Sequence, residues 1–318
     1  MMETTNQTIT KTEPGKQQHN STSQKITPFL WFDGKAEEAG KFYVSIFKNS
    51  KIVTMKPWGE GSPFPKEQIM NATFELDGQQ FYAFDAGPQF KFNPSISFFV
   101  VCETEAETDD VWQKLVDGGN VMMALDKYDW SKKYGWLQDC FGISWQVSFG
   151  KISDVGQKFT PSLLFTGEQH GKAEAAVNFY TSVFDNSSIT GILKYTAGEN
   201  QAEGTVKHAQ FSLSGQIFMA MESMPHPFKF NEAISFFVSC KTQEEIDHFW
   251  NKLTADGGQE SMCGWLKDKF GLSWQIVPPV LGELLADKDP AKAGSVMQAM
   301  MKMKKIIIAD LEKAYEQV

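Results

Sequence analysis

Apolar and polar positions along the chain follow two spacings, one typical of strands and one typical of helices. The strand pattern predicts extended segments at Ile26–Phe32, Ser95–Cys102 and Ile143–Phe149. Apolar residues recur at helical spacing in Ala36–Phe47, and Glu105–Asp117 is a second predicted helix. This part of the chain is therefore predicted to form strand–helix–strands twice in succession.

A hairpin is predicted after the first helix. Asn71–Leu76 and Gln79–Asp85 flank Asp77-Gly78, a pair that favours a type I′ turn. Much later in the chain, Ser214-Gly215 stands at the corresponding place between two similar segments.

The chain repeats itself over a long period. FKFNPSISFFV at 90–100 recurs as FKFNEAISFFV at 228–238, with nine of eleven residues identical. GWLQDCFGISWQV at 135–147 recurs as GWLKDKFGLSWQI at 264–276, with nine of thirteen identical. A period of this length indicates duplication of a whole domain rather than a solenoid. We expect one copy at 25–149, a linker at 150–157 and a second copy at 158–278.

The two ends of the chain differ from the repeated part. Residues 1–24 are rich in Thr, Gln, Asn and Ser and lack an apolar stretch, which predicts a disordered polar tail rather than a secretory signal. Residues 279–318 form a predicted helical extension, with Asp289 as a helix cap and Pro290 in the first helical position. Its predicted helices are Val280–Ala286, Pro290–Met303 and Ile308–Gln317.

Composition narrows the classes of partner. The 318 residues carry a net charge of −9 and contain no Arg, which argues against nucleic acid as a partner. No apolar run approaches the roughly 18 residues that would suggest a membrane span. Four Cys are too few for a disulfide framework, so a cytoplasmic location is expected.

Three motifs, each present twice, resemble the PhnB-like family of the vicinal-oxygen-chelate superfamily, the glyoxalase/bleomycin-resistance/dioxygenase group. They are the opening ITPFLWFDGKAEEAGKFYVSIF with its counterpart from Phe159, the FKFN segments, and the GWL…FG.SWQ endings. The resemblance implies an α+β fold of two tandem glyoxalase/bleomycin-resistance-like domains, each of paired βαβββ modules forming a curled mixed sheet around a cavity, followed by the C-terminal helices. Family naming attaches a 3-demethylubiquinone-9 3-methyltransferase label. No Gly-rich loop with an acidic ribose partner is present to hold an S-adenosyl donor, so the methyltransferase activity is not expected.

Strand alternation predicts which side chains line the cavity. In the closing strands the apolar residues should pack on the helices, which leaves the polar residues between them facing inward. The same argument applied to every predicted strand gives a polar and aromatic lining. The ligand-cavity candidates are Thr27, Trp31, Thr73, Tyr82, Ser97, Phe99, Gln146, Thr160, His208, Gln210, Met221, Ser235, Phe237 and Gln275.

The resemblance also places metal-ligand positions, and this chain departs from the pattern there. The positions fall near Thr27, Tyr82–Asp85, Ser95 and Gln146, and in the second copy near Thr160, Met219–Glu222, Ala233 and Gln275. Thr, Ser and Ala cannot replace imidazole or carboxylate at a transition-metal site. No cofactor and no tightly bound metal are therefore expected, while a weak divalent-metal site stays open.

Two functions remain open, and the sequence does not decide whether the protein is an enzyme. The first is a module that binds a small molecule in the polar and aromatic cavity. The second is a glyoxalase- or dioxygenase-type lyase or oxidoreductase, with a weak metal site or with His208 as a general base beside Glu222. Simple strand pairing puts Glu222 on the face opposite His208, which weakens the second function. The two copies are expected to form a pseudo-dimer within one chain, and further homo-oligomerisation is left open.

Overall fold

The computed structural model describes residues 24–59 and 64–318. The predicted disordered tail therefore lies outside the described residues, apart from Gln24. The first copy contains β1 (Ile26–Phe32), α1 (Ala36–Ile46), β2 (Lys51–Pro57), β3 (Ile69–Leu76), β4 (Gln79–Asp85), β5 (Ile96–Cys102), α2 (Glu105–Val116), β6 (Asn120–Tyr128), β7 (Ser131–Gln138) and β8 (Ser144–Phe149).

The second copy repeats this order after a short helix, α3 (Ile152–Val155). Its elements are β9 (Phe159–Phe165), the 3-10 turn η1 (Gly167–Gln169), α4 (Ala173–Val183), β10 (Ser188–Lys194), β11 (Val206–Leu213), β12 (Gln216–Glu222), β13 (Ile234–Ser239), α5 (Gln243–Thr254), the 3-10 turn η2 (Ala255–Gly257), β14 (Gln259–Glu260), β15 (Trp265–Lys267) and β16 (Ser273–Val277). The α+β class, the βαβββ modules and the duplication are confirmed.

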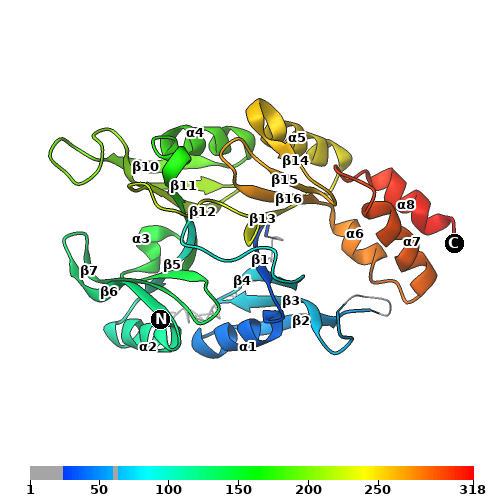
Figure 1. Cartoon of the computed structure of the whole chain (residues 1–318), viewed down its shortest axis with the longest axis horizontal. Helices are drawn as coiled ribbons and strands as arrows, with labels where there is room; N and C mark the ends of the chain where they lie inside the picture. The colour runs from blue at the N-terminus through cyan, green and yellow to red at the C-terminus, as the bar shows by residue number, and fades with distance from the viewer. Residues whose placement is uncertain (1–23, 60–63) are drawn as a thin grey trace, which may run out of the picture.

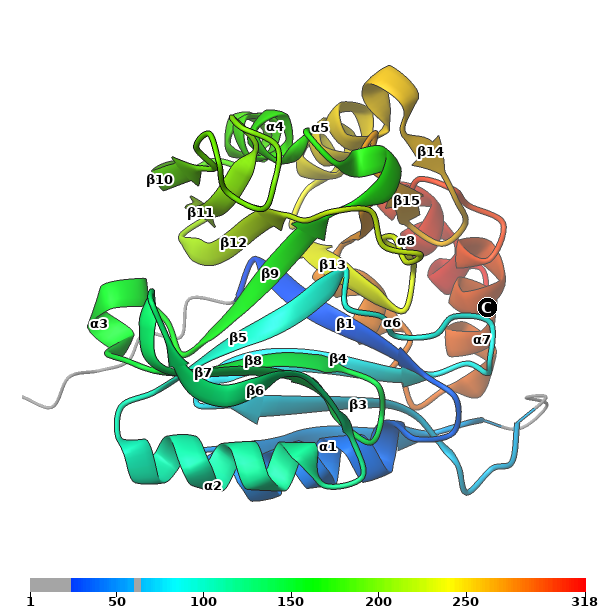
Figure 2. The ribbon, with the colours of Figure 1, turned by 60° about the vertical axis from the view of Figure 1, so that its left-hand side comes forward.

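The described strands form two eight-stranded mixed sheets, and each sheet joins one module of each copy. Sheet A has the order β14-β15-β16-β13-β1-β4-β3-β2, and sheet B the order β10-β11-β12-β9-β5-β8-β7-β6. In Figures 1 and 2 the strands lie between α1 and α2 on one side and α4 and α5 on the other. The two copies are thus interleaved as an intrachain pseudo-dimer, so each curled sheet is completed by the other copy.

The two junctions between the copies are reciprocal. Strand β1 pairs antiparallel with β13, with Thr27 opposite Phe237, and β9 pairs antiparallel with β5, with Thr160 opposite Phe99. The equivalent strand pairs of the repeat therefore make both seams.

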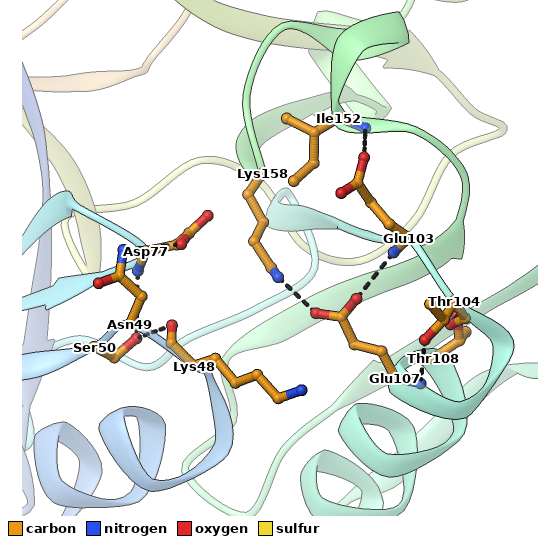
Figure 3. Close-up of polar contacts among 10 residues, drawn as sticks. All are labelled: Lys48, Asn49, Ser50, Asp77, Glu103, Thr104, Glu107, Thr108, Ile152 and Lys158. Atoms are coloured by element: carbon orange, nitrogen blue, oxygen red, sulfur yellow. Dashed lines mark hydrogen bonds and ion pairs between the residues drawn. The ribbon is translucent and has the colours of Figure 1, made fainter. Parts of the chain in front are cut away.

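Polar contacts reinforce these seams. Lys158 of the second copy donates to Glu107 of α2 at 2.6 Å (Figure 3), and Lys25 of the first copy lies 3.2 Å from Glu245 of α5. At the other end of the seams the two FKFN segments are hydrogen-bonded to each other. Asn93 Nδ2 donates to the Lys229 carbonyl at 3.0 Å and Asn231 Nδ2 to the Lys91 carbonyl at 2.9 Å. This exchange gives the most similar segments of the repeat a structural role.

A buried carboxylate links the two modules of each copy. In the second copy Asp268 accepts hydrogen bonds from the Tyr180 hydroxyl of α4 at 2.8 Å and from Trp274 Nε1 of β16 at 2.9 Å. Asp139 receives the same pair of bonds from Tyr43 and Trp145 in the first copy. Burial raises the pKa of Asp268 to about 6, against the hydrogen bonds that lower it. This carboxylate thus holds the two modules of one copy together, while each module shares a sheet with a module of the other copy.

The predicted turns are confirmed. Asp77 and Gly78 have φ values of 49° and 81°, and Ser214 and Gly215 have 49° and 82°. Two consecutive positive φ angles define the type I′ turn that the right-handed twist of a hairpin favours.

The C-terminal extension is helical, as predicted. It forms α6 (Pro279–Leu284), α7 (Pro290–Met300) and α8 (Ile308–Glu316), and Asp289 caps α7 by accepting from the Ala291 N–H at 2.9 Å. Backbone carbonyl oxygens between α7 and α8 accept hydrogen bonds from the N–H groups of Cys263 and Gly264, just before β15. In the described residues, no helix is long and apolar enough to cross a membrane.

Candidate ligand site

Each sheet has a face covered by helices and an opposite face, which we call the inner face. In β9, Phe159, Leu163 and Phe165 belong to the hydrophobic core, so alternation puts Thr160 and Ser162 on the inner face. The same alternation and the strand registers place all fourteen predicted cavity residues on inner faces.

The residues gather by sheet, not by copy. Sheet A holds Thr27, Trp31, Thr73, Tyr82, Ser235, Phe237 and Gln275. Sheet B holds Ser97, Phe99, Gln146, Thr160, His208, Gln210 and Met221. Any ligand on an inner face would therefore contact both copies.

Each inner face has a glutamine whose side-chain amide donates a hydrogen bond to a serine. Gln146 Nε2 donates to Ser97 Oγ at 2.7 Å in sheet B, and Gln275 Nε2 donates to Ser235 Oγ at 2.9 Å in sheet A. Gln146 Oε1 also accepts from the Tyr134 hydroxyl at 2.8 Å. These side chains stiffen the inner faces, and their amide groups are already engaged.

Three further aromatic residues of the inner faces lie where no strand was predicted. Trp136 of β7 and Trp265 of β15 belong to the GWL segments, and Tyr134 of β7 directly precedes the first of them. Trp136 Nε1 donates to Ser144 Oγ at 2.7 Å, and Trp265 packs edge-on against Phe29 with ring centroids 5.5 Å apart. The alternation of large inward residues with Gly135 and Leu137 was the available signal.

Aromatic side chains occupy the inner face of sheet A. The Phe29 ring lies 5.8 Å from the Phe84 ring and 6.5 Å from the Tyr82 ring, in addition to its contact with Trp265. Trp31 packs against Phe84 at 5.4 Å and Trp265 at 6.0 Å. These four rings of the first copy are half-buried and cluster with Trp265 of the second copy on this face.

The counterpart positions in sheet B carry smaller or more flexible side chains. The repeat aligns ITPFLWF with FTPSLLF and QQFYAFD with QIFMAME. Phe29, Trp31, Tyr82 and Phe84 are therefore replaced by Ser162, Leu164, Met219 and Met221. The ring cluster of sheet A has no equivalent at these positions of sheet B.

Two hydroxyls on the inner face of sheet B are buried without a partner. Thr160 is 0% and Ser162 1% exposed, and within residues 24–59 and 64–318 neither hydroxyl oxygen makes a hydrogen bond. A buried polar group left in this state costs about 1–3 kcal/mol. Such groups call for an explanation, for example an ordered water, an ion or a bound molecule.

The other predicted polar residues of this face, His208 and Gln210, are uncharged. Burial lowers the pKa of His208, which favours its neutral imidazole at neutral pH. Gln210 Nε2 donates to the Val155 carbonyl of α3 at 3.2 Å, so the linker between the copies reaches this face. Lys158, at the start of β9, is engaged with Glu107 (Figure 3).

The carboxylates near the expected metal positions already accept hydrogen bonds from backbone N–H groups. Asp85 accepts from the backbone N–H groups of Lys35 and Ala36 at the start of α1. Glu222 accepts from the Ala173 N–H at 2.7 Å at the start of α4 and from the Val206 N–H at 2.8 Å. Glu222 therefore faces its helix and does not act beside His208.

The residues present do not fit a transition-metal centre. With Glu222 engaged, the expected ligand positions around sheet B offer hydroxyl, amide and thioether groups, which hold such ions poorly. In the part of the chain that the structure describes, no group of three or more His, Cys, Asp or Glu could hold a metal ion.

Curled sheets of paired βαβββ modules, each with helices on one face, define the fold class of this protein. The chain belongs to the family described as 3-demethylubiquinone-9 3-methyltransferase, whose model matches residues 24–148 and 157–277. The resemblance of both copies to this family is confirmed.

Known relatives match one copy or both. A solved structure described as a putative 3-demethylubiquinone-9 3-methyltransferase, PhnB protein, from Bacillus cereus is 46% identical, with 40% of this chain and 100% of that chain covered and a TM-score of 0.39. Protein YjdN of Escherichia coli (strain K12) is 23% identical over 141 residues, which are 40% of this chain and 95% of that protein. Glyoxalase I from Zea mays is 9% identical, with 78% of this chain and 92% of that chain covered and a TM-score of 0.51. This last likeness shows a shared fold across both copies.

Proposed function

We propose that this protein binds a small uncharged organic molecule on the inner face of sheet B. The observation that carries the proposal is the pair of buried, unpartnered hydroxyls of Thr160 and Ser162 in the described part of the chain. A molecule with hydrogen-bonding groups that reaches them removes the cost of leaving them unsatisfied.

The uncharged character of the molecule follows from the lining. Hydroxyl, amide, thioether and neutral imidazole groups offer no counter-charge to an ion that loses its water. Lys158, just before β9, and Glu222 of β12 are committed to other partners. An ionised ligand would therefore bind more weakly than an uncharged one of the same shape.

The proposed binding needs no tightly bound metal. The residues at the metal-ligand positions of sheet B support this part of the proposal. Glu222 accepts a hydrogen bond at the start of α4, and Gln146 donates one to Ser97. The same arrangement disfavours the glyoxalase- or dioxygenase-type alternative. We place the protein in the cytoplasm, in keeping with four cysteines that all remain free.

Benzamide and benzoate test the binding site because they share a shape and differ in charge. We expect ligand-observed NMR titrations to show benzamide binding to the native protein more tightly than benzoate. Ser162→Phe, which installs the residue of the first copy, should abolish benzamide binding. Phe29→Ser is the matched control and should leave this binding in place. Undiminished benzamide binding by the Ser162→Phe variant, or none by the native protein, would refute the proposal.

A further inference from the structure

A cavity of about 420 Å³ lies where the first FKFN segment, the start of α1 and the loop between β7 and β8 meet. Aromatic rings make up much of its wall, among them Trp31, Phe90 and Phe141. Cys140, an exposed free cysteine, also lines it. Among the residues that the structure describes, no ligand candidate on the inner face of sheet B lines this cavity, so it is separate from the site proposed above.

The second copy carries a cation at the position of Cys140. The GWL segments align this cysteine with Lys269. The Lys269 ammonium lies 4.3 Å from the ring centroid of Phe179 and 5.7 Å from that of Phe270. It also lies 3.5 Å from a carboxylate oxygen of Asp256. The second copy thus holds an ammonium group against two rings, in cation–π geometry, and beside a carboxylate.

The first copy keeps the rings and the carboxylate without this cation. Phe42 and Phe141 stand at the corresponding positions, with ring centroids 5.5 Å apart and planes at 65°, against 5.9 Å and 61° in the second copy. Asp117-Gly118-Gly119 recurs as Asp256-Gly257-Gly258, so the carboxylate is retained in the sequence. In the described part of the chain, no lysine ammonium lies over either ring of the first copy.

The charges around Cys140 favour a cation. Burial and nearby carboxylates, Glu38 and Asp117 among them, raise the pKa of its thiol, which therefore stays neutral at pH 7. Lys35 also lines the cavity, but its ammonium is bound to Glu38 at 2.6 Å. The lining has one further acidic and one further basic residue, Asp33 and Lys91. Because these charges cancel in pairs, the carboxylate of Asp117 leaves the surroundings of Cys140 with a net negative charge.

We propose that this cavity binds a small organic ammonium ion. Its charged group lies beside Cys140, in the place that the Lys269 ammonium takes in the second copy. Its apolar part packs against the aromatic wall of the cavity. The site is separate from the inner face of sheet B, so this inference goes beyond the proposed function and does not depend on it.

Benzylamine and benzyl alcohol test the site, because the two molecules have nearly the same shape and only the amine is charged at pH 7. Ligand-observed NMR titration of the full chain should show benzylamine binding about fivefold more tightly, as expected for one partly exposed cation–π contact. Benzyl alcohol measures what the aromatic wall contributes without the charge.

Two variants at position 140 separate charge from shape. Cys140→Lys installs the residue of the second copy and supplies an ammonium group from the chain itself. We expect this variant to bind benzylamine no more tightly than benzyl alcohol. Cys140→Ser is the control, since it replaces the thiol without adding a charge, and it should keep the preference for benzylamine. Residue 140 is exposed, so both variants should fold.

A matched pair of variants tests the carboxylate. Asp117→Asn should reduce the preference for benzylamine about twofold, as expected for one exposed ion pair. Asp256→Asn, the equivalent change in the second copy, should leave the preference unchanged. Equal affinities of the native protein for benzylamine and benzyl alcohol, or an undiminished preference in Cys140→Lys, would overturn the ammonium site.

Discussion

Asp268 illustrates how single residues serve the fold rather than the site. Its carboxylate is buried and receives the Tyr180 hydroxyl, Trp274 Nε1 and the backbone N–H groups of Phe270 and Leu272. Burial nevertheless raises its pKa to about 6, above the ordinary value of 3.8. The folded state therefore holds this proton more tightly than the unfolded state does.

This shift predicts a pH dependence of stability. The contribution of Asp268 to the free energy of unfolding is largest below about pH 4 and falls as the pH rises to about 6, by up to roughly 3 kcal/mol. Asp268→Asn cannot titrate, so the stability advantage of the native protein over this variant should be larger at pH 4 than at pH 7. Urea unfolding of both proteins at the two pH values measures it, and an advantage that grows with pH would contradict the assigned shift.

At the residue scale, the sequence predicted on which face of a strand a side chain lies, but not what that side chain does. Alternation in strands is a local property, so it placed residues such as Thr160 and Phe99 on the inner face. Whether Thr160 has a partner depends on the side chains of the neighbouring strands β5 and β12, and alternation within one strand does not predict it. The structural role of Asp268 was missed because its donors are spread over α4, β16 and the loop before it.

Among the elements, the strand junctions decide how the copies depend on each other. Strand β1 has β4 on one side and β13 of the other copy on the other, and β5 lies between β8 and β9. The sequence predicted the turns and the C-terminal helices because their signals are local. It predicted a pseudo-dimer but not which strands meet, because pairing across copies is a property of the tertiary fold.

The junctions predict the behaviour of an isolated copy. Residues 25–150 expressed alone would expose β1 and β5 as unpaired edges, and exposed edges favour association. We expect this fragment to self-associate or aggregate in sedimentation and light-scattering experiments. A stable, folded monomer would count against the interleaved arrangement.

For the whole molecule, the duplication has produced two unequal sheets. One inner face carries the ring cluster of Phe29, Tyr82 and Phe84, and the other has Ser162, Met219 and Met221 at the corresponding positions. Both copies contribute to each face, so fusing them in one chain allows the two faces to diverge. A homodimer would carry two identical faces, and any change would appear in both.

The donor chemistry of the whole molecule predicts its metal content. Protein purified without chelators should contain well under one equivalent of Mn, Fe, Ni or Zn per chain by elemental analysis. The reason is that Asp85 and Glu222 cap helices and leave hydroxyl and amide groups at the expected ligand positions. One equivalent of any of these metals, lost when Gln146 is replaced by Ala, would restore the enzyme hypothesis.

The central claim, that one small uncharged molecule binds on the inner face of sheet B, is tested most directly by a crystal soaked with 4-bromobenzamide. Anomalous scattering from bromine locates the molecule without reference to any assay. We predict one peak per chain, on the inner face of sheet B. A peak on the inner face of sheet A, or peaks only outside both inner faces, would contradict the account.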